Sequence, residues 1–206
     1  EMRVNPVRFR RNTGLFREEF SRLDQSMKMT LALFACFLAS ELLIAQEENY
    51  PVPPDSLKRE GVPVGTITKG VFANSAIFPG TTREFAVYVP AQYDGSQPAA
   101  LMVFQDGLGY LNNVPVTFDK PIQSGEMPVT VGLFVNPGVV PEINENALAR
   151  YNRSFEYDAV DDRYARFLLT EMMPHALKGL KVTADPNLRA ICGSSSGGIA
   201  AFQVAW

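Results

Sequence analysis

A run of five small residues, 193–197, lies between two apolar segments and constrains the fold more than any other feature of the chain. The segment before it, 188–192, is short and mostly apolar and follows the turn-forming residues 185–187, a pattern typical of a buried parallel strand. The segment after it, 198–206, is small and apolar, as expected of a helix packed closely against a sheet. A flexible Ser/Gly linker would not be bounded by apolar segments on both sides. The run therefore predicts a sharp turn between a strand and a helix.

Ser195 is the one serine of this run that has glycine both two residues before it and two residues after it. The resulting G-x-S-x-G pattern is that of a nucleophile elbow, a strained strand-to-helix turn that lifts the serine hydroxyl clear of the sheet. Because strand, turn and helix are predicted in the order that the elbow requires, we predict Ser195 to be a nucleophile.

The remainder of the chain body predicts an α/β fold. Residues 65–72 and 83–89 alternate apolar with polar side chains around a Pro-Gly turn, which predicts an antiparallel pair. Residues 99–104 and 129–135 are nearly continuous apolar runs that end in turn residues, as parallel strands covered on both faces do. Between residues 160 and 177, apolar side chains that include Val160 recur at helical spacing. We expect an antiparallel hairpin followed by parallel strands with helices on both faces.

The first 65 residues are expected to lie outside this fold. Residues 27–45 combine a short positive start, an apolar core and a small residue at a plausible cleavage point, which predicts a signal peptide. A buried amphipathic helix is the alternative, and the apolar core is too short to span a membrane. Residues 1–26 are interpreted as an upstream extension, either a charged region or translated sequence before a true start at Met27, and 46–65 as a Pro-rich linker. Residues 66–206 then form the folded domain.

Charge and composition exclude several classes of function. The chain has 19 basic and 22 acidic residues, and the net negative charge lies in residues 46–206, so no basic patch for nucleic acid or anionic membrane is expected. One histidine and two cysteines cannot assemble the usual metal-ligand sets, and no nucleotide-binding pattern is present. We therefore expect no metal and no cofactor. Cys36 falls in the predicted leader, and Cys192 is interpreted as a small core residue.

Four segments along the chain together resemble a known family. The sequence is similar to the putative-esterase family of α/β-hydrolases, which includes enterochelin, feruloyl and acetylxylan esterases, esterase D and the mycolyltransferases, with the strongest likeness to bacterial enterochelin-esterase-like proteins. The resemblance spans about 65–206 and rests on residues 104–107, 134–138, 153–174 and 191–198. It implies a serine carboxylic ester hydrolase that acts through an acyl-enzyme on an ester such as a siderophore or an acylated polysaccharide. The predicted signal peptide adds the expectation that this ester is extracellular or periplasmic.

The resemblance also implies roles for particular residues. Ser195 would attack the ester carbonyl, and the backbone N–H of Ser196 would be one donor to the oxyanion. The second donor would come from the loop after the third strand, at Gly107 or Leu108, although a plain turn explains Asp106-Gly107 as well. Residues 153–157 match a family segment, in which Arg153, Glu156 and Tyr157 could equally form an ion pair or hydrogen-bond network or contact substrate.

The sequence departs from this family in its catalytic base. In α/β-hydrolases the acid and the histidine follow the serine, whereas here the only histidine, His175, precedes it and is expected to have a surface or helix-end role. Two explanations compete: the chain is a fragment of a longer product that ends in the helix after Ser195, with its C-terminal strands missing, or it is a complete protein that has lost catalysis. The non-methionine start and the apolar end favour the fragment. In either case the chain alone should be nearly inactive, because without a base the serine stays protonated. A noncatalytic carbohydrate- or ligand-binding module on a hydrolase scaffold is the alternative function.

Overall fold

The computed structural model describes Thr30 and residues 51–206, and the structural statements below refer to these residues. The predicted upstream extension (1–26) and signal peptide (27–45) lie outside the described residues, except for Thr30. In the described part of the chain, no helix has the length and apolar character needed to cross a membrane. The folded unit that contains the sheet comprises Val52–Trp206.

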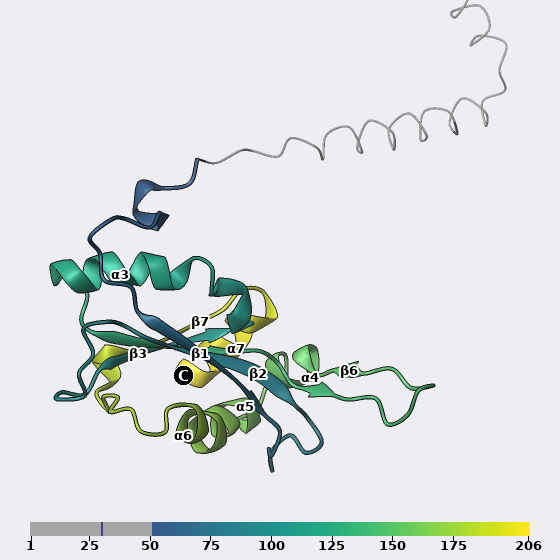
Figure 1. The fold of residues 1–206 in the computed structure, drawn as a ribbon. Coiled ribbons are helices and arrows are strands. Elements are labelled where there is room, and N and C mark those ends of the chain that lie inside the picture. Colours follow the sequence, from purple (N-terminus) through teal and green to yellow (C-terminus); the bar gives the residue numbers. More distant parts are fainter. Residues whose placement is uncertain (1–29, 31–50) are drawn as a thin grey trace, which may run out of the picture. The chain divides into compact units, whose positions relative to one another are not determined.

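A five-stranded sheet in the order β1-β2-β4-β3-β7 forms the centre of this unit (Figure 1). Its strands are β1 (Thr66–Phe72), β2 (Arg83–Val89), β4 (Thr130–Val135), β3 (Ala100–Gln105) and β7 (Arg189–Cys192). The first two strands form the predicted antiparallel hairpin, and β4, β3 and β7 run parallel to one another. The α/β fold with a parallel core is therefore confirmed, with β2 joined to β4 in antiparallel orientation.

One face of the sheet is covered by α3 (Val114–Ser124), which lies above the strands in Figure 1. Phe118 and Ile122 of this helix are buried against sheet residues that include Tyr88, Phe104 and Phe134. No helix is predicted at these residues, and α3 contains two prolines, Pro115 and Pro121. Proline is tolerated in the first helical turn, where Pro115 lies.

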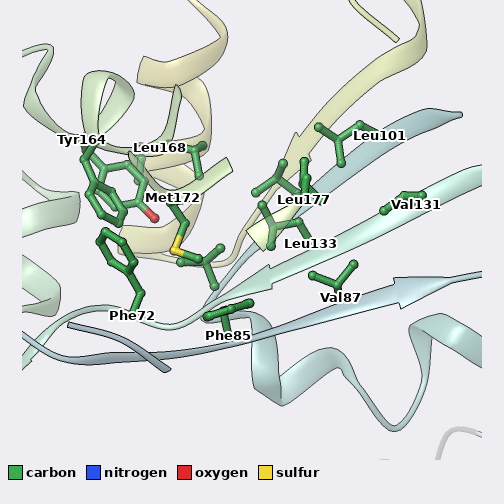
Figure 2. Packing of buried hydrophobic residues seen from close by; sticks show 14 of the residues in the cluster. Phe72, Phe85, Val87, Leu101, Val131, Leu133, Tyr164, Leu168, Met172 and Leu177 are labelled. Carbon is green, nitrogen blue, oxygen red and sulfur yellow. The ribbon is translucent and has the colours of Figure 1, made fainter. Parts of the chain in front are cut away.

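The opposite face carries a continuous helical stretch composed of α5 (Arg163–Phe167), a π-helical segment η3 (Leu168–Met172) and α6 (Met173–Ala176). Tyr164, Leu168 and Met172 from this stretch pack against sheet side chains such as Val87, Leu133 and Leu101 (Figure 2). The predicted helix over 160–177 is thus confirmed in its centre. The helix begins at Arg163, later than predicted, and Val160, which precedes it, is 94% exposed.

The connection from β4 to this stretch contains a small antiparallel pair, β5 (Val139–Val140) and β6 (Arg150–Tyr151), and then α4 (Arg153–Tyr157). The last helix, α7 (Ser196–Ala205), directly follows β7 and buries its small residues Gly197, Ala200 and Ala201. Short 3₁₀ turns complete the described elements: η1 (Pro54–Ser56), η2 (Gly107–Tyr110) and η4 (Pro186–Leu188).

The strand β7 lies at the edge of the sheet and, among the described residues, pairs with β3 alone. Its first two residues are exposed rather than buried. Hollows of about 450 and 160 Å³ lie beside this strand, the larger lined mainly by apolar side chains such as Leu101, Leu168 and Val204. The parallel orientation of β7 is as predicted, and its outer edge is open.

Candidate active site

Ser195 occupies the turn between β7 and α7, with φ 55° and ψ −127°. Within the described residues, only Ser195 and Asp106 are non-glycine residues with positive φ. A conformation of this kind costs an L-residue of order 1–3 kcal/mol and persists where the surrounding structure enforces it, most often at functional sites. The side chain of Ser195 is exposed. An exposed hydroxyl is therefore held on a strained strand-to-helix turn.

The glycines on each side of Ser195 permit one close contact with backbone and one with a side chain. A Cβ atom on Gly193 would lie 2.3 Å from the carbonyl oxygen of Gly197, and a Cβ atom on Gly197 would lie 2.9 Å from the Asp106 carboxylate oxygen Oδ2. Either distance is shorter than real Cβ contacts allow. The turn can close only because these two positions lack a side chain.

The first backbone N–H groups of α7 lie at the N-terminus of the helix, where amides have no acceptor within the helix itself. Gly197 N donates to the carbonyl of Ser194 at 2.9 Å, and Gly198 N donates to the carbonyl of Ser195 at 2.9 Å. The amide of Ser196 has no hydrogen bond to another residue in the described part of the chain. That N–H remains available beside the Ser195 hydroxyl.

The loop after β3 lies next to this turn, because β3 and β7 are adjacent and parallel and Phe104 is in register with Cys192. Asp106 begins the loop in the left-handed conformation, with φ 55° and ψ 36°. Leu108 N donates to Asn136 Oδ1 at 3.2 Å. Gly107 is buried, and its amide has no hydrogen bond to any residue that the structure describes. Of the two amides predicted as the second oxyanion donor, Leu108 is therefore engaged by a side chain and Gly107 is not.

Arg153 from α4 connects the two loops. Its Nε and Nη2 atoms donate to Asp106 Oδ1 and Oδ2 at 2.8 and 2.7 Å, and Nη2 also lies 3.3 Å from the carbonyl oxygen of Ser194. The Asp106 amide donates to the Tyr157 hydroxyl at 3.2 Å. Burial is the main cause that raises the pKa of Tyr157, to about 12, so this phenol stays protonated at neutral pH. No pattern in the sequence reveals this connection.

Glu156 of α4 forms a buried ion pair with Arg83. Its oxygens accept hydrogen bonds from Arg83 Nη1 at 2.8 Å and Nη2 at 3.0 Å, and Oε2 also accepts one from Gly138 N at 3.2 Å. Neither side chain of the ion pair is exposed. Of the two roles considered for this segment, the ion pair and hydrogen-bond network is therefore what the structure contains.

Two further polar side chains lie beneath the turn. The Tyr164 hydroxyl donates to Gln105 Oε1, and Gln105 Cβ is 3.0 Å from the position that a Cβ on Gly193 would take. Gln105 is fully buried at the end of β3. Cys192, at the end of β7, is half-buried, and burial raises the pKa of its thiol.

His175 lies far across the sheet from Ser195. Its ring packs against Phe72 of β1 and Phe85 of β2, with centroids 5.0 and 5.6 Å apart, whereas Ser195 follows β7 at the opposite edge. No other histidine occurs in the chain. The described residues contain no cluster of three or more His, Cys, Asp or Glu side chains that could hold a metal ion.

Comparisons with known proteins agree with the resemblance found in the sequence. No curated protein matches the chain in sequence. Among solved structures, a ferulic acid esterase from Anaeromyces mucronatus is similar, at 19% identity and TM-score 0.53, over 71% of this chain and 56% of that one. An enterochelin esterase from Shigella flexneri is similar at 14% identity and TM-score 0.55, over 76% of this chain and 36% of that one. A feruloyl esterase module from Clostridium thermocellum, complexed with sinapinate, has 17% identity and TM-score 0.50, over 75% of this chain and 53% of that one.

These structural similarities establish the fold, and the chain spans only about half the length of the ferulic acid esterase. The family itself is established by the sequence. The family described as "Putative esterase" matches residues 75–206, more than half of the chain and all of β2 to α7. The chain belongs to this family of α/β-hydrolase esterases.

Proposed function

We propose that this protein is a serine carboxylic ester hydrolase and that Ser195 is its nucleophile. The single observation that carries the proposal is the exposed hydroxyl of Ser195 at φ 55°, between a parallel strand and the start of a helix whose Ser196 amide is free among the described residues. A hydroxyl at such a turn is accessible to a substrate from above the sheet, and an adjacent backbone donor can stabilise negative charge.

In the proposed reaction, Ser195 Oγ attacks the ester carbonyl carbon while its proton passes to a general base. The carbonyl electrons move onto oxygen, and the resulting oxyanion accepts hydrogen bonds from Ser196 N–H and from an amide of the loop after β3. Collapse of this intermediate breaks the ester bond, and the alcohol leaves with the proton. Water then attacks the acyl-serine, releases the acid and restores the hydroxyl. Each oxyanion donor typically contributes about 3 kcal/mol of barrier lowering.

The second oxyanion donor is proposed to be Gly107 or Leu108. Gly107 has the amide that is free of partners within the described residues. If Leu108 is the donor, Asn136 must release its amide when substrate binds, because their present hydrogen bond is 3.2 Å long. Asn136→Ala should then increase reactivity if Leu108 is used and leave it unchanged if Gly107 is used.

The general base and its acid are proposed to come from polypeptide that follows Trp206 in the full gene product. His175 is packed against Phe72 and Phe85 across the sheet and cannot serve Ser195 without unfolding. The structural relatives are longer than this chain, which leaves room for both groups. The 206-residue chain by itself should therefore acylate slowly or not at all.

The substrate is proposed to be an extracellular or periplasmic ester. Two structural relatives are described as ferulic acid and enterochelin esterases, which supports an acylated plant polysaccharide or a siderophore ester equally. The predicted signal peptide at 27–45 supports export.

The proposal is tested by covalent labelling. A fluorophosphonate should modify the wild-type full gene product once, on the peptide that contains Ser195, and should modify the 206-residue chain far more slowly or not at all. Ser195→Ala should abolish the adduct, whereas Ser194→Ala and Ser196→Ala, the matched controls, should retain it. For the full gene product, Ser195→Ala should reduce hydrolysis of p-nitrophenyl acetate by at least about 10³-fold. Unchanged hydrolysis by the Ser195→Ala protein would refute the proposal.

A noncatalytic carbohydrate- or ligand-binding module is the second candidate, favoured by the distance of the only histidine from Ser195. The coding sequence downstream of residue 206 separates the two functions. An Asp or Glu followed by a His in separate loops after later strands supports the esterase, and their absence supports the binding module.

A further inference from the structure

The guanidinium of Arg153 contacts both loops that carry the proposed oxyanion donors. Two of its nitrogens bind the Asp106 carboxylate, and one of these also donates to the Ser194 carbonyl. Asp106 immediately precedes Gly107, and Ser194 immediately precedes Ser195. Arg153 therefore contacts one residue in each donor loop, Asp106 and Ser194. It belongs to neither loop, because it lies on α4, which follows β4 and β6 in the chain.

The helix α4 holds Asp106 in two ways. Arg153 binds the side chain of Asp106, and the Tyr157 hydroxyl accepts a hydrogen bond from its backbone amide. Arg153 and Tyr157 are four residues apart and so lie on the same face of this helix. Asp106 is one of the two described non-glycine residues with positive φ, and the other is Ser195. Arg153 and Tyr157 thus hold Asp106 directly. Arg153 also contacts Ser194, the residue immediately before Ser195.

We propose that Arg153 is a positioning residue, which fixes the loop after β3 against the Ser195 turn so that the two oxyanion donors stay at the spacing that the tetrahedral intermediate requires. This inference rests on the function proposed above. It assigns Arg153 no contact with substrate, since its effect acts through Asp106 and the Ser194 carbonyl.

A second observation separates this role from that of a structural ion pair. The Arg153 and Asp106 side chains are 36% and 30% exposed, and ion pairs as accessible as this contribute little to stability. Catalysis is more sensitive, because a displacement of about 1 Å in a reacting group or donor can lower a rate by a factor of about 10². Loss of Arg153 should therefore affect reactivity far more than folding.

The bidentate geometry also predicts which substitution restores function. Lysine carries the charge of arginine as a single point and cannot make two parallel hydrogen bonds to one carboxylate. Arg153→Lys can retain the contact with Asp106 and lose the one with Ser194. It should restore part of the reactivity that Arg153→Met, a neutral variant of similar length, loses.

The experiment compares wild type with Arg153→Met, Arg153→Lys and a matched control, Arg163→Met. Arg163 forms a similar ion pair with Asp161, at 2.7 Å and with 37% and 39% exposed side chains, but it lies at the start of α5 and makes no hydrogen bond to either donor loop. Three quantities are measured: the midpoint of thermal unfolding, the rate constant for fluorophosphonate labelling of Ser195 in the full gene product, and amide hydrogen exchange followed by NMR at Leu108 and Gly197, which lie in the two donor loops and whose amides are hydrogen-bonded.

Arg153→Met should label at least about tenfold more slowly than wild type and exchange both amides at least about tenfold faster, with a midpoint within a few degrees. Arg153→Lys should fall between the two, and Arg163→Met should match wild type. If Arg153→Met does not fold, Asp106→Asn, which keeps the size of the side chain and removes its charge, replaces it with the same expectations.

Two results overturn the inference: labelling and exchange unchanged in Arg153→Met, or equal losses in Arg163→Met. Failure of the proposed function gives a different result, in which the full gene product with the wild-type sequence itself carries no adduct on Ser195. In that case the amide-exchange comparison still decides whether Arg153 orders the two loops.

Discussion

The buried ion pair between Arg83 and Glu156 allows a quantitative test of the fold. Both side chains are fully buried, and Glu156 accepts hydrogen bonds from two Arg83 nitrogens and from Gly138 N. The Arg83 guanidinium also lies 4.0 Å from the centroid of the Phe167 ring, and its Nε atom has no hydrogen-bond partner among the described residues. Glu156→Gln would remove the negative charge and leave an uncompensated cation in the core.

Removal of one partner from a buried ion pair typically costs about 3–5 kcal/mol. For a domain of this size each kcal/mol lowers the unfolding midpoint by about 2–4 °C, so Glu156→Gln should lower it by roughly 6–20 °C. Urea titration at pH 7, followed by far-UV circular dichroism, measures the free energy of unfolding directly. Asp162→Asn is the control, because the Arg166–Asp162 pair is exposed and its loss should cost less than about 1 kcal/mol.

The double variant Arg83→Met with Glu156→Leu tests whether the unpaired Arg83 charge causes the loss of stability in Glu156→Gln. It removes both charges and keeps apolar volume, so it should recover most of the stability that Glu156→Gln loses. A Glu156→Gln protein within about 1 kcal/mol of wild type would contradict the argument, because the Arg83 charge would then be compensated by some group other than Glu156.

Three further predictions test the turn, the phenols and the open edge. Gly193→Ala should lower the unfolding midpoint and abolish Ser195 labelling, since its Cβ would lie 2.3 Å from the Gly197 carbonyl oxygen, whereas Gly109→Ala meets no atom within 4 Å and should leave both unchanged. The free energy of unfolding should fall by about 1.4 kcal/mol per pH unit between pH 10 and 12 through Tyr157 alone, because its pKa in the folded protein is about 12 and the unfolded phenol loses its proton first, near pH 10. Urea titrations at pH 10, 11 and 12 measure this slope, which Tyr157→Phe should reduce. Ala190→Lys, on the exposed edge strand β7, should slow aggregation of the 206-residue chain in light scattering, and Ala73→Lys, at another exposed position, should not.

The elements that the sequence predicts are those whose signal is local. The hairpin β1–β2, the apolar strands β3 and β4, and the order of strand, turn and helix around Ser195 follow from periodicity and from turn residues. The sequence does not predict the helix α3, because its two prolines are usually a sign of a break, although its buried residues Phe118 and Ile122 are at helical spacing. The prediction that Val160 belongs to a helix is wrong, because an apolar residue at the correct spacing carries no information about whether the helix has begun.

The contacts that organise the candidate site are of a different kind, because they join residues far apart in sequence. Arg153 and Asp106 are 47 residues apart, and Arg83 and Glu156 are 73 apart. Periodicity and spacing report which face of one element a residue occupies, but they contain no information about which acidic residue of another element lies opposite it. The sequence therefore leaves 153–157 open between substrate contact and an internal network, and only the folded sheet brings Arg83 to Glu156 and Asp106 to Arg153.

The short helix α4 has two roles in the fold: it is anchored in the core through Glu156, and it contacts the two loops of the candidate site through Arg153. Arg153, Glu156 and Tyr157 all lie within the five residues of α4, so Glu156 can be buried against Arg83 while Arg153 and Tyr157 face the loop after β3. The buried pair sets where α4 lies, because a fully buried carboxylate can be accommodated only opposite its cation. The partly exposed Arg153 guanidinium then transmits that position to Asp106 and to the Ser194 carbonyl. If this order is correct, Glu156→Gln should weaken the hold on both loops along with stability, whereas Arg153→Met should loosen the loops in a helix that stays in place.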